Sequence, residues 1–155
     1  MYGYDFKRLL NTSMASSDYP LVISRVAIGV FFFATGYNKL FVPDNQHLML
    51  ETITSAGIPF PEVMAVFVSF CECALGLSLA AGLLTRISAA VLFIISLVAL
   101  ITVGVNYIPE GINFLTWYSW LLYLPEPLYM LICLMLMVRG GLGYSVDGWL
   151  LKRFF

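Results

Sequence analysis

The chain has 155 residues, of which 61% are hydrophobic and only 11% are charged, and its formal net charge is −1. This composition is too apolar for an ordinary soluble domain. A net charge near zero, without a cluster of basic residues, also excludes an electrostatic nucleic-acid interface, so no nucleic acid is expected as a partner.

Four apolar segments are long enough to cross a bilayer, which takes about 20 residues of helix. They cover roughly residues 21–42, 62–84, 87–106 and 117–138. Because these segments use most of the chain, we expect residues 1–155 to form one domain. The predicted fold is all-α, an integral membrane four-helix bundle with short interfacial helices, so the lipid bilayer is its main partner.

The first predicted helix carries two cations and two glycines on one face. Ser17 or Asp18 can cap this helix, and Pro20 suits its first turn. Arg25, Gly29, Phe32, Gly36 and Lys39 follow at intervals of three and four residues. The N-terminal region resembles a signal peptide, but the helix continues through Lys39, so we expect no cleavage. Two interpretations stay open for Arg25 and Lys39: they extend to the two membrane surfaces, or they pair inside the bundle.

The predicted outer loop after this helix contains residues 46–56, whose spacing suits a short interfacial helix that Gly57 ends. His47, the only histidine of the chain, is expected at the outer surface. A single histidine without neighbouring metal-binding groups does not make a metal site, so no metal is expected.

The second predicted span has one ionisable residue, Glu72, near its middle. A carboxylate at this depth is unfavourable by several kcal/mol unless it is protonated, paired or beside water, so it must face protein. Helical spacing places Ala65, Ser69, Gly76 and Ala80 on the same face. Small residues let helices approach closely in lipid, so this face is predicted to point inward. Thr85 is a plausible cap for the third span, which carries no charge and is expected to serve packing.

The three cysteines, Cys71, Cys73 and Cys133, all fall inside predicted spans. Cys71 and Cys73 are two positions apart on a helix, hence on nearly opposite faces, and cannot easily form a disulfide. We interpret the cysteines as small apolar packing residues in preference to a redox or metal-binding pair.

The basic residues predict the orientation of the chain. Six of them fall on one side of the four spans: Lys7, Arg8, Arg86, Arg139, Lys152 and Arg153. The positive-inside rule therefore places both the N and the C terminus in the cytoplasm. Because side chains lean toward the N-terminus of their own helix, Lys39 and Glu72 converge while Arg25 leans away. Their backbones are expected to differ in depth by roughly 10 Å, so direct contact needs extended side chains or a bridging water.

The fourth predicted span is broken by Pro125 and Pro127. The half-helix that begins at Glu126 is too short to cross alone, so the break is expected at membrane depth or just under the outer interface. Glu126 either caps this half-helix at the interface or lines a pocket that opens outward. The tail from Gly148 to Phe155 is expected to anchor as an interfacial helix, which Ser145 or Asp147 could cap.

Five short motifs follow one another along the chain, namely Gly36-Tyr37-Asn38-Lys39-Leu40, Gly57 to Glu62, Glu72 to Leu77, Gly82 to Ala89 and Gly141 to Asp147. In this order and spacing, the motifs resemble the DoxX family of small four-helix membrane proteins. Members resemble a subunit of thiosulfate:quinone oxidoreductase, and others are linked to membrane-associated oxidoreductase or thiol-stress complexes. The resemblance therefore implies a redox-linked membrane subunit that contacts a quinone, without implying that this chain is itself a catalyst. The prolines that flank Glu126 depart from the family pattern.

Three functions from different classes follow. The first is an inner-membrane subunit linked to a redox or quinone-dependent process, with a polar intramembrane pocket centred on Glu72 and Lys39. Further candidate site residues are Glu126, Asn38 and Arg25, with Tyr37 beside them. The second is a non-catalytic assembly subunit that binds a membrane or soluble partner protein, or a second copy of the chain. The third is a small-metabolite carrier, which a broken helix favours. No covalently bound cofactor is expected, and a quinone is the candidate ligand.

Overall fold

The computed structural model describes residues 19–140, 145–147 and 149, and every regular element in them is a helix. The elements are α2 (Tyr19–Phe41), α3 (Pro43–Ser55), α4 (Pro61–Ala81), α5 (Thr85–Thr102), a 3-10 helix η1 (Gly104–Tyr107), α6 (Phe114–Tyr123) and α7 (Pro125–Arg139). The predicted all-α class is confirmed. The expected caps Ser17 and Asp18, the signal-like N-terminal stretch and most of the amphipathic tail lie outside the described residues.

The protein is a membrane protein with three or four spans in the part of the chain described. α2, α4 and α5 are each long and apolar enough to cross a bilayer. α6 and α7 pass the same test together, but they are bent by 72° at the break between them. The break lies at Leu124, whose backbone is extended (φ −72°, ψ 142°). The ring of Pro125 disfavours a helical backbone at the preceding residue, which explains the position of the break.

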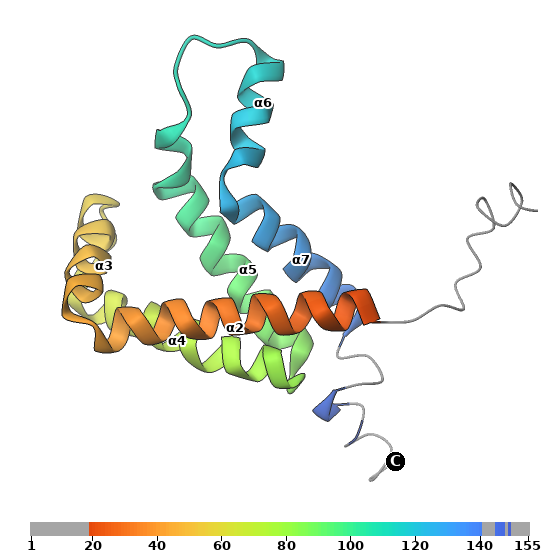
Figure 1. Ribbon diagram of the computed structural model, residues 1–155. Helices are drawn as coiled ribbons and strands as arrows, with labels where there is room; N and C mark the ends of the chain where they lie inside the picture. Colours follow the sequence, from red (N-terminus) through yellow and green to blue (C-terminus); the bar gives the residue numbers. More distant parts are fainter. Residues whose placement is uncertain (1–18, 141–144, 148, 150–155) are drawn as a thin grey trace, which may run out of the picture.

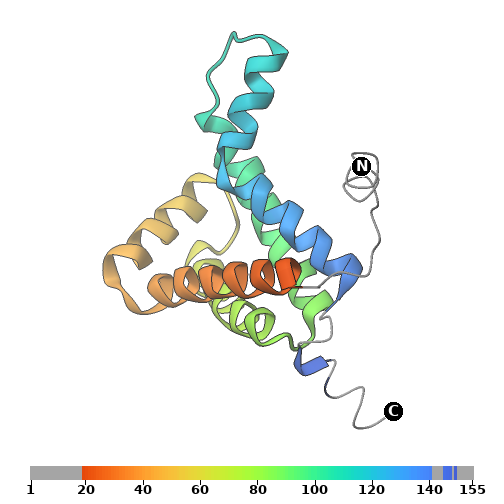
Figure 2. The same ribbon diagram turned by 45° about the vertical axis from the view of Figure 1, so that its right-hand side comes forward.

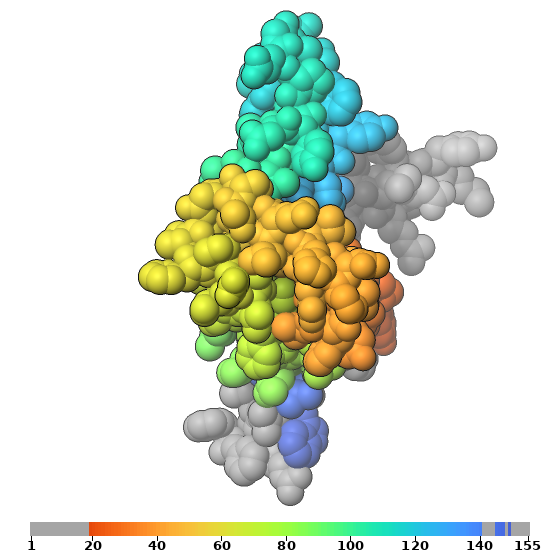
Figure 3. Space-filling model, turned by 90° about the vertical axis from the view of Figure 1, so that its left-hand side faces the viewer, coloured from red at the N-terminus to blue at the C-terminus, as the bar shows by residue number. Residues whose placement is uncertain are grey.

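The long helices form two antiparallel pairs, α2 with α4 and α5 with α7, and one pair lies across the other (Figures 1 and 2). A tight turn joins α4 to α5, and near this turn the two pairs pack together (Figure 1). Toward their other ends the pairs diverge. α3 lies over the far ends of α2 and α4, and the end formed by α5 and α6 projects above it in Figure 3.

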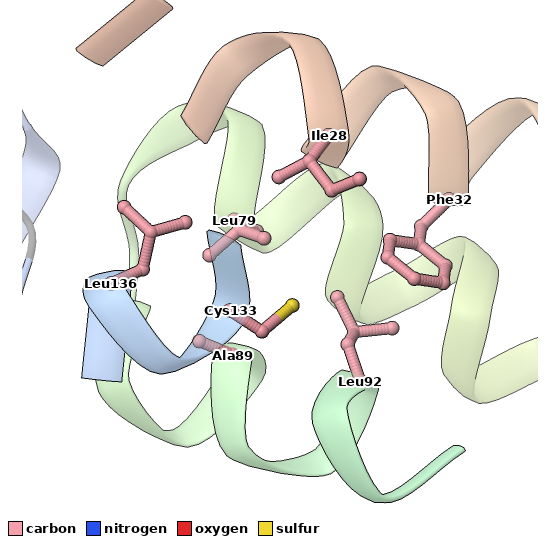
Figure 4. Packing of buried hydrophobic residues seen from close by; sticks show 7 residues of the cluster. All are labelled: Ile28, Phe32, Leu79, Ala89, Leu92, Cys133 and Leu136. Carbon is pink, nitrogen blue, oxygen red and sulfur yellow. The ribbon is translucent and has the colours of Figure 1, made fainter. Parts of the chain in front are cut away.

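The hydrophobic core lies where the two pairs meet, and all four long helices contribute to it (Figure 4). Its buried residues are Ile28 and Phe32 from α2, Leu79 from α4, Ala89 and Leu92 from α5, and Cys133 and Leu136 from α7. Cys133 is fully buried there, as expected of a cysteine used for packing. The core joins the two helix pairs at one end of the molecule, whereas their other ends lie apart.

α2 and α4 approach each other through glycines. A Cβ atom added to Gly29 would lie 2.5 Å from the backbone nitrogen of Ala80, and one on Gly36 or Gly76 would overlap the facing backbone in the same way. Both predicted faces are confirmed, because Arg25, Gly29, Phe32 and Gly36 of α2 and Ala65, Ser69, Glu72 and Gly76 of α4 are buried. At these glycines the backbones of α2 and α4 are too close for a side chain or a ligand to lie between them.

The α4–α5 turn is held by Asp147 from the C-terminal segment. Its Oδ1 accepts a hydrogen bond from the Leu84 nitrogen at 2.8 Å, and its Oδ2 accepts bonds from the nitrogen and the hydroxyl of Thr85, both at 3.0 Å. The Asp147 nitrogen in turn donates to the Gly82 carbonyl at 3.0 Å. One expectation was therefore wrong, because Leu84, not Thr85, holds the cap position of α5. The Asp147 carboxylate caps α5, whereas most of the tail helix that Ser145 or Asp147 was expected to cap lies outside the described residues.

Candidate functional site

Lys39 and Glu72 form an ion pair between α2 and α4. The Lys39 Nζ donates hydrogen bonds to both carboxylate oxygens of Glu72, at 2.9 Å to Oε1 and 2.7 Å to Oε2. The Glu72 side chain is only 7% exposed and the Lys39 side chain 29% exposed. A buried carboxylate must have its charge compensated, and this two-point contact provides the compensation from the neighbouring helix.

The direct contact corrects the expected difference in depth between the two residues. The facing glycines fix the register of α2 against α4, with Gly29 level with Ala80 and Gly36 level with Cys73. This register places Lys39 within two residues of Glu72, an axial offset of about 3 Å at the helical rise. The side chains therefore reach each other directly, without needing a bridging water.

A cavity of about 420 Å³ lies beside this ion pair, between the diverging helix pairs. Its walls are mostly apolar side chains from α3, α4 and α5, including Met49, Ile53, Phe67, Val68, Ile95 and Ala99. Its charged lining residues are Lys39, Glu72 and Glu126. An apolar cavity of this volume with a few convergent polar groups has the usual character of a small-molecule site.

Glu126 lines the cavity from the other helix pair. It lies in the first turn of α7, directly after the break, as the sequence predicted. Its Oε2 atom is buried, and no hydrogen-bond partner for it is found among the described residues. The structure thus places Glu126 on the cavity wall, and its position at a helix N-terminus favours a negative charge.

A second cavity, of about 290 Å³, shares Lys39 with the first. It is lined by residues of α2, α3 and α4, among them Gln46, Met49 and the exposed Glu62. Lys39 therefore lies at the boundary between the two cavities, which agrees with its being more exposed than Glu72.

Comparison with known proteins places this chain in a family. The DoxX family profile matches residues 21–105, more than half of the 155-residue chain. The chain belongs to the DoxX family. No curated protein and no solved structure matches it. In this DoxX chain, Lys39 and Glu72 fall within the matched segment, whereas Glu126 lies beyond it.

Other candidate residues of the DoxX chain do not join the cavity. Arg25 is buried at the opposite end of α2, where it lies against Gly82 and in the electrostatic field of Asp147. Asn38 is exposed, and it does not line the cavity. Tyr37 is also exposed and stacks with Phe41, with ring centroids 4.7 Å apart. His47 is exposed on α3, in line with its expected surface position.

The two neighbouring cysteines lie on different sides of α4. Cys71 lines the cavity, whereas Cys73 packs against Gly36 of α2. All three cysteines of the chain are free thiols. The prediction that Cys71 and Cys73 face apart and do not form a disulfide is confirmed.

The contribution of the third span to the site was missed by the sequence analysis. α5 supplies six lining residues, Val91, Ile94, Ile95, Val98, Ala99 and Thr102, and Val103 directly after it supplies another, so this span does more than pack. Cavity-lining residues of this kind are apolar like the rest of the span. Thr102 is the one polar residue among them. Because threonine is common at helix ends, it does not by itself indicate a cavity.

Proposed function

We propose that this DoxX protein is a multi-pass subunit of the cell inner membrane that binds a quinone in the 420 Å³ cavity beside Lys39 and Glu72. The observation that carries the proposal is the buried ion pair on the wall of an otherwise apolar cavity. The distribution of basic residues supports a topology with both termini in the cytoplasm.

A quinone headgroup is a flat apolar ring with carbonyl oxygens, and it takes up two electrons and two protons when it is reduced. The apolar walls suit the ring. Lys39 has three N–H donors and uses two of them on Glu72, so one remains for a carbonyl oxygen of the ligand. Glu72 can hold a proton beside that oxygen and pass it on. A membrane or soluble partner protein supplies the electrons.

The quinone content of the purified protein tests this proposal. Protein purified in mild detergent is extracted and its quinone measured by mass spectrometry for the wild type, for Glu72→Gln and for the control Glu62→Gln, which changes an exposed residue of the same helix. We expect the wild type and the control to retain quinone. We expect the quinone content of Glu72→Gln to fall about tenfold or more, because the variant loses the carboxylate that holds the Lys39 ammonium group at the cavity wall. An unchanged quinone content in Glu72→Gln contradicts the proposal.

A second candidate function is an assembly subunit without a ligand. It is favoured by one observation, namely that the Lys39–Glu72 pair joins α2 to α4 and so also serves their packing. In that case Glu72→Gln lowers the thermal stability of the protein and of its complex with a partner, while no quinone is found in either variant.

A further inference from the structure

The acceptor groups of the cavity outnumber its donors. The Lys39 ammonium group donates to both oxygens of Glu72, which leaves one N–H donor for a ligand. Glu126 contributes a second carboxylate from the other helix pair, and its buried Oε2 makes no hydrogen bond with the described residues. A buried acceptor without a donor is unfavourable, so this atom stabilises any ligand that brings a hydrogen-bond donor to it.

The surroundings of Glu126 explain why the protein does not supply the donor itself. Its neighbour is Gly104 at the start of η1, where an added Cβ atom would lie 3.7 Å from Oε2 and 3.4 Å from the Leu124 side chain. Glycine has no side chain that could donate a bond. Of the lining residues near the open end of α5, Val98 and Val103 are apolar, and the Thr102 hydroxyl already donates to the Val98 carbonyl at 2.7 Å.

We propose that the cavity selects the reduced, hydroxyl-bearing form of a quinone-type ligand, with the Glu126 carboxylate accepting the hydrogen bond from a ligand hydroxyl. This inference rests on the proposed function and names the redox form that the same site prefers. A hydroquinone carries two hydroxyl donors, whereas an oxidised quinone has only carbonyl acceptors. The acceptor-rich wall therefore favours binding of the hydroquinone.

This preference has a consequence for the redox chemistry of the bound ligand. When a site binds the reduced form more tightly than the oxidised form, it raises the midpoint potential of the bound couple. For a two-electron couple, each tenfold difference in affinity corresponds to about 30 mV. The bound quinone thus becomes a better electron acceptor than the same quinone in lipid.

Three ligands that share one ring test the inference with the full-length protein in nanodiscs. They are a short-chain ubiquinol analogue, its oxidised quinone and its di-O-methyl ether, which keeps the reduced ring but has no hydroxyl donor. Dissociation constants are measured by equilibrium dialysis, under argon for the ubiquinol. We expect the ubiquinol to bind about tenfold more tightly than the ether and the quinone, the effect of one hydrogen bond to a charged acceptor.

Variants at position 126 connect the preference to this residue. Glu126→Leu is expected to abolish the difference between ubiquinol and ether while leaving the affinity for the ether nearly unchanged. Glu126→Gln keeps a carbonyl acceptor and is expected to retain part of the preference, and it serves if the leucine variant does not fold. Glu110→Leu, in the exposed loop after η1, is the matched control and is expected to behave as the wild type.

The outcomes separate this inference from the proposed function. Equal binding of ubiquinol and ether, a preference for the oxidised quinone, or a preference that survives Glu126→Leu overturns the inference and leaves quinone binding intact. Binding of none of the three ligands to the wild type overturns the proposed function, and the inference with it.

Discussion

The backbone of Gly36 on α2 lies directly against the backbone of Cys73 on α4, with no room for a side chain on the glycine. This contact sets the register that brings Lys39 to Glu72. The ion pair of the cavity therefore depends on a packing contact one helical turn away, and both can be tested separately.

Replacing Gly36 tests the close approach of α2 and α4. Alanine in place of glycine normally stabilises a helix by about 1 kcal/mol. Here we expect Gly36→Ala to reduce the free energy of unfolding by roughly 1–3 kcal/mol, because the new Cβ pushes the two backbones apart. Denaturant titration of the protein in micelles measures the change. Ala34→Val, on the exposed side of α2, is the control and should change little. A stabilised Gly36→Ala variant would show that the helices do not touch there.

The Lys39–Glu72 pair should show strong coupling in a double-mutant cycle. Lys39→Met leaves the buried Glu72 carboxylate without its cation, and we expect a loss of about 3 kcal/mol in stability. Combining Lys39→Met with Glu72→Met removes both charges, so the double variant should be more stable than the sum of the single changes predicts. The cycle is measured by thermal or denaturant unfolding. Additive effects would mean that the two side chains do not interact.

The Asp147 contacts with the α4–α5 turn should contribute to stability as a helix cap does. Asp147→Ala removes the acceptor of the Leu84 and Thr85 nitrogens, and we expect a loss of about 1–2 kcal/mol. Hydrogen exchange at these two amides should become faster at the same time. Val146→Ala alters the exposed neighbour and should leave both measurements unchanged. Unaltered exchange in Asp147→Ala would exclude the cap.

Either Pro125 or Pro127 should be enough to keep the bend between α6 and α7. In a continuous helix Pro127 would clash with the carbonyl of Tyr123, so Pro125→Ala alone should keep the bend. In Pro125→Ala/Pro127→Ala, we expect α6 and α7 to merge. Spin labels at the exposed positions 119 and 134, in a background without native cysteines, should then move apart to a backbone separation of about 22 Å. An unchanged distance in the double variant would assign the bend to tertiary packing.

Sequence periodicity predicted the parts of the fold that depend on one helix at a time. The small-residue face of α4 was predicted because alanine, serine and glycine recur at helical spacing around Glu72. The face of α2 was predicted because its two glycines recur at the same spacing. The break of the fourth span was found because proline acts on its own backbone.

Among the features that join distant segments, the approach of Lys39 to Glu72 was predicted, but three others were not. Asp147 caps a helix that begins 62 residues earlier in the chain, and no local pattern indicates this pairing. The register of α2 against α4 was misjudged because it was inferred from assumed depths in the bilayer, whereas the glycine contacts determine it. The role of α5 in the cavity escaped notice because Ile94 and Val98 resemble any lipid-facing residue.

The close backbone contact between α2 and α4 also determines how a molecule can reach the cavity. The cavity lies on the flank of α4 that faces α5, and its rim includes the exposed side chains Phe67, Ile94 and Val98. In a membrane these side chains border the acyl chains. A ligand of the proposed site would therefore enter sideways from the hydrocarbon phase, and its occupancy would follow its mole fraction in the lipid instead of its concentration in water.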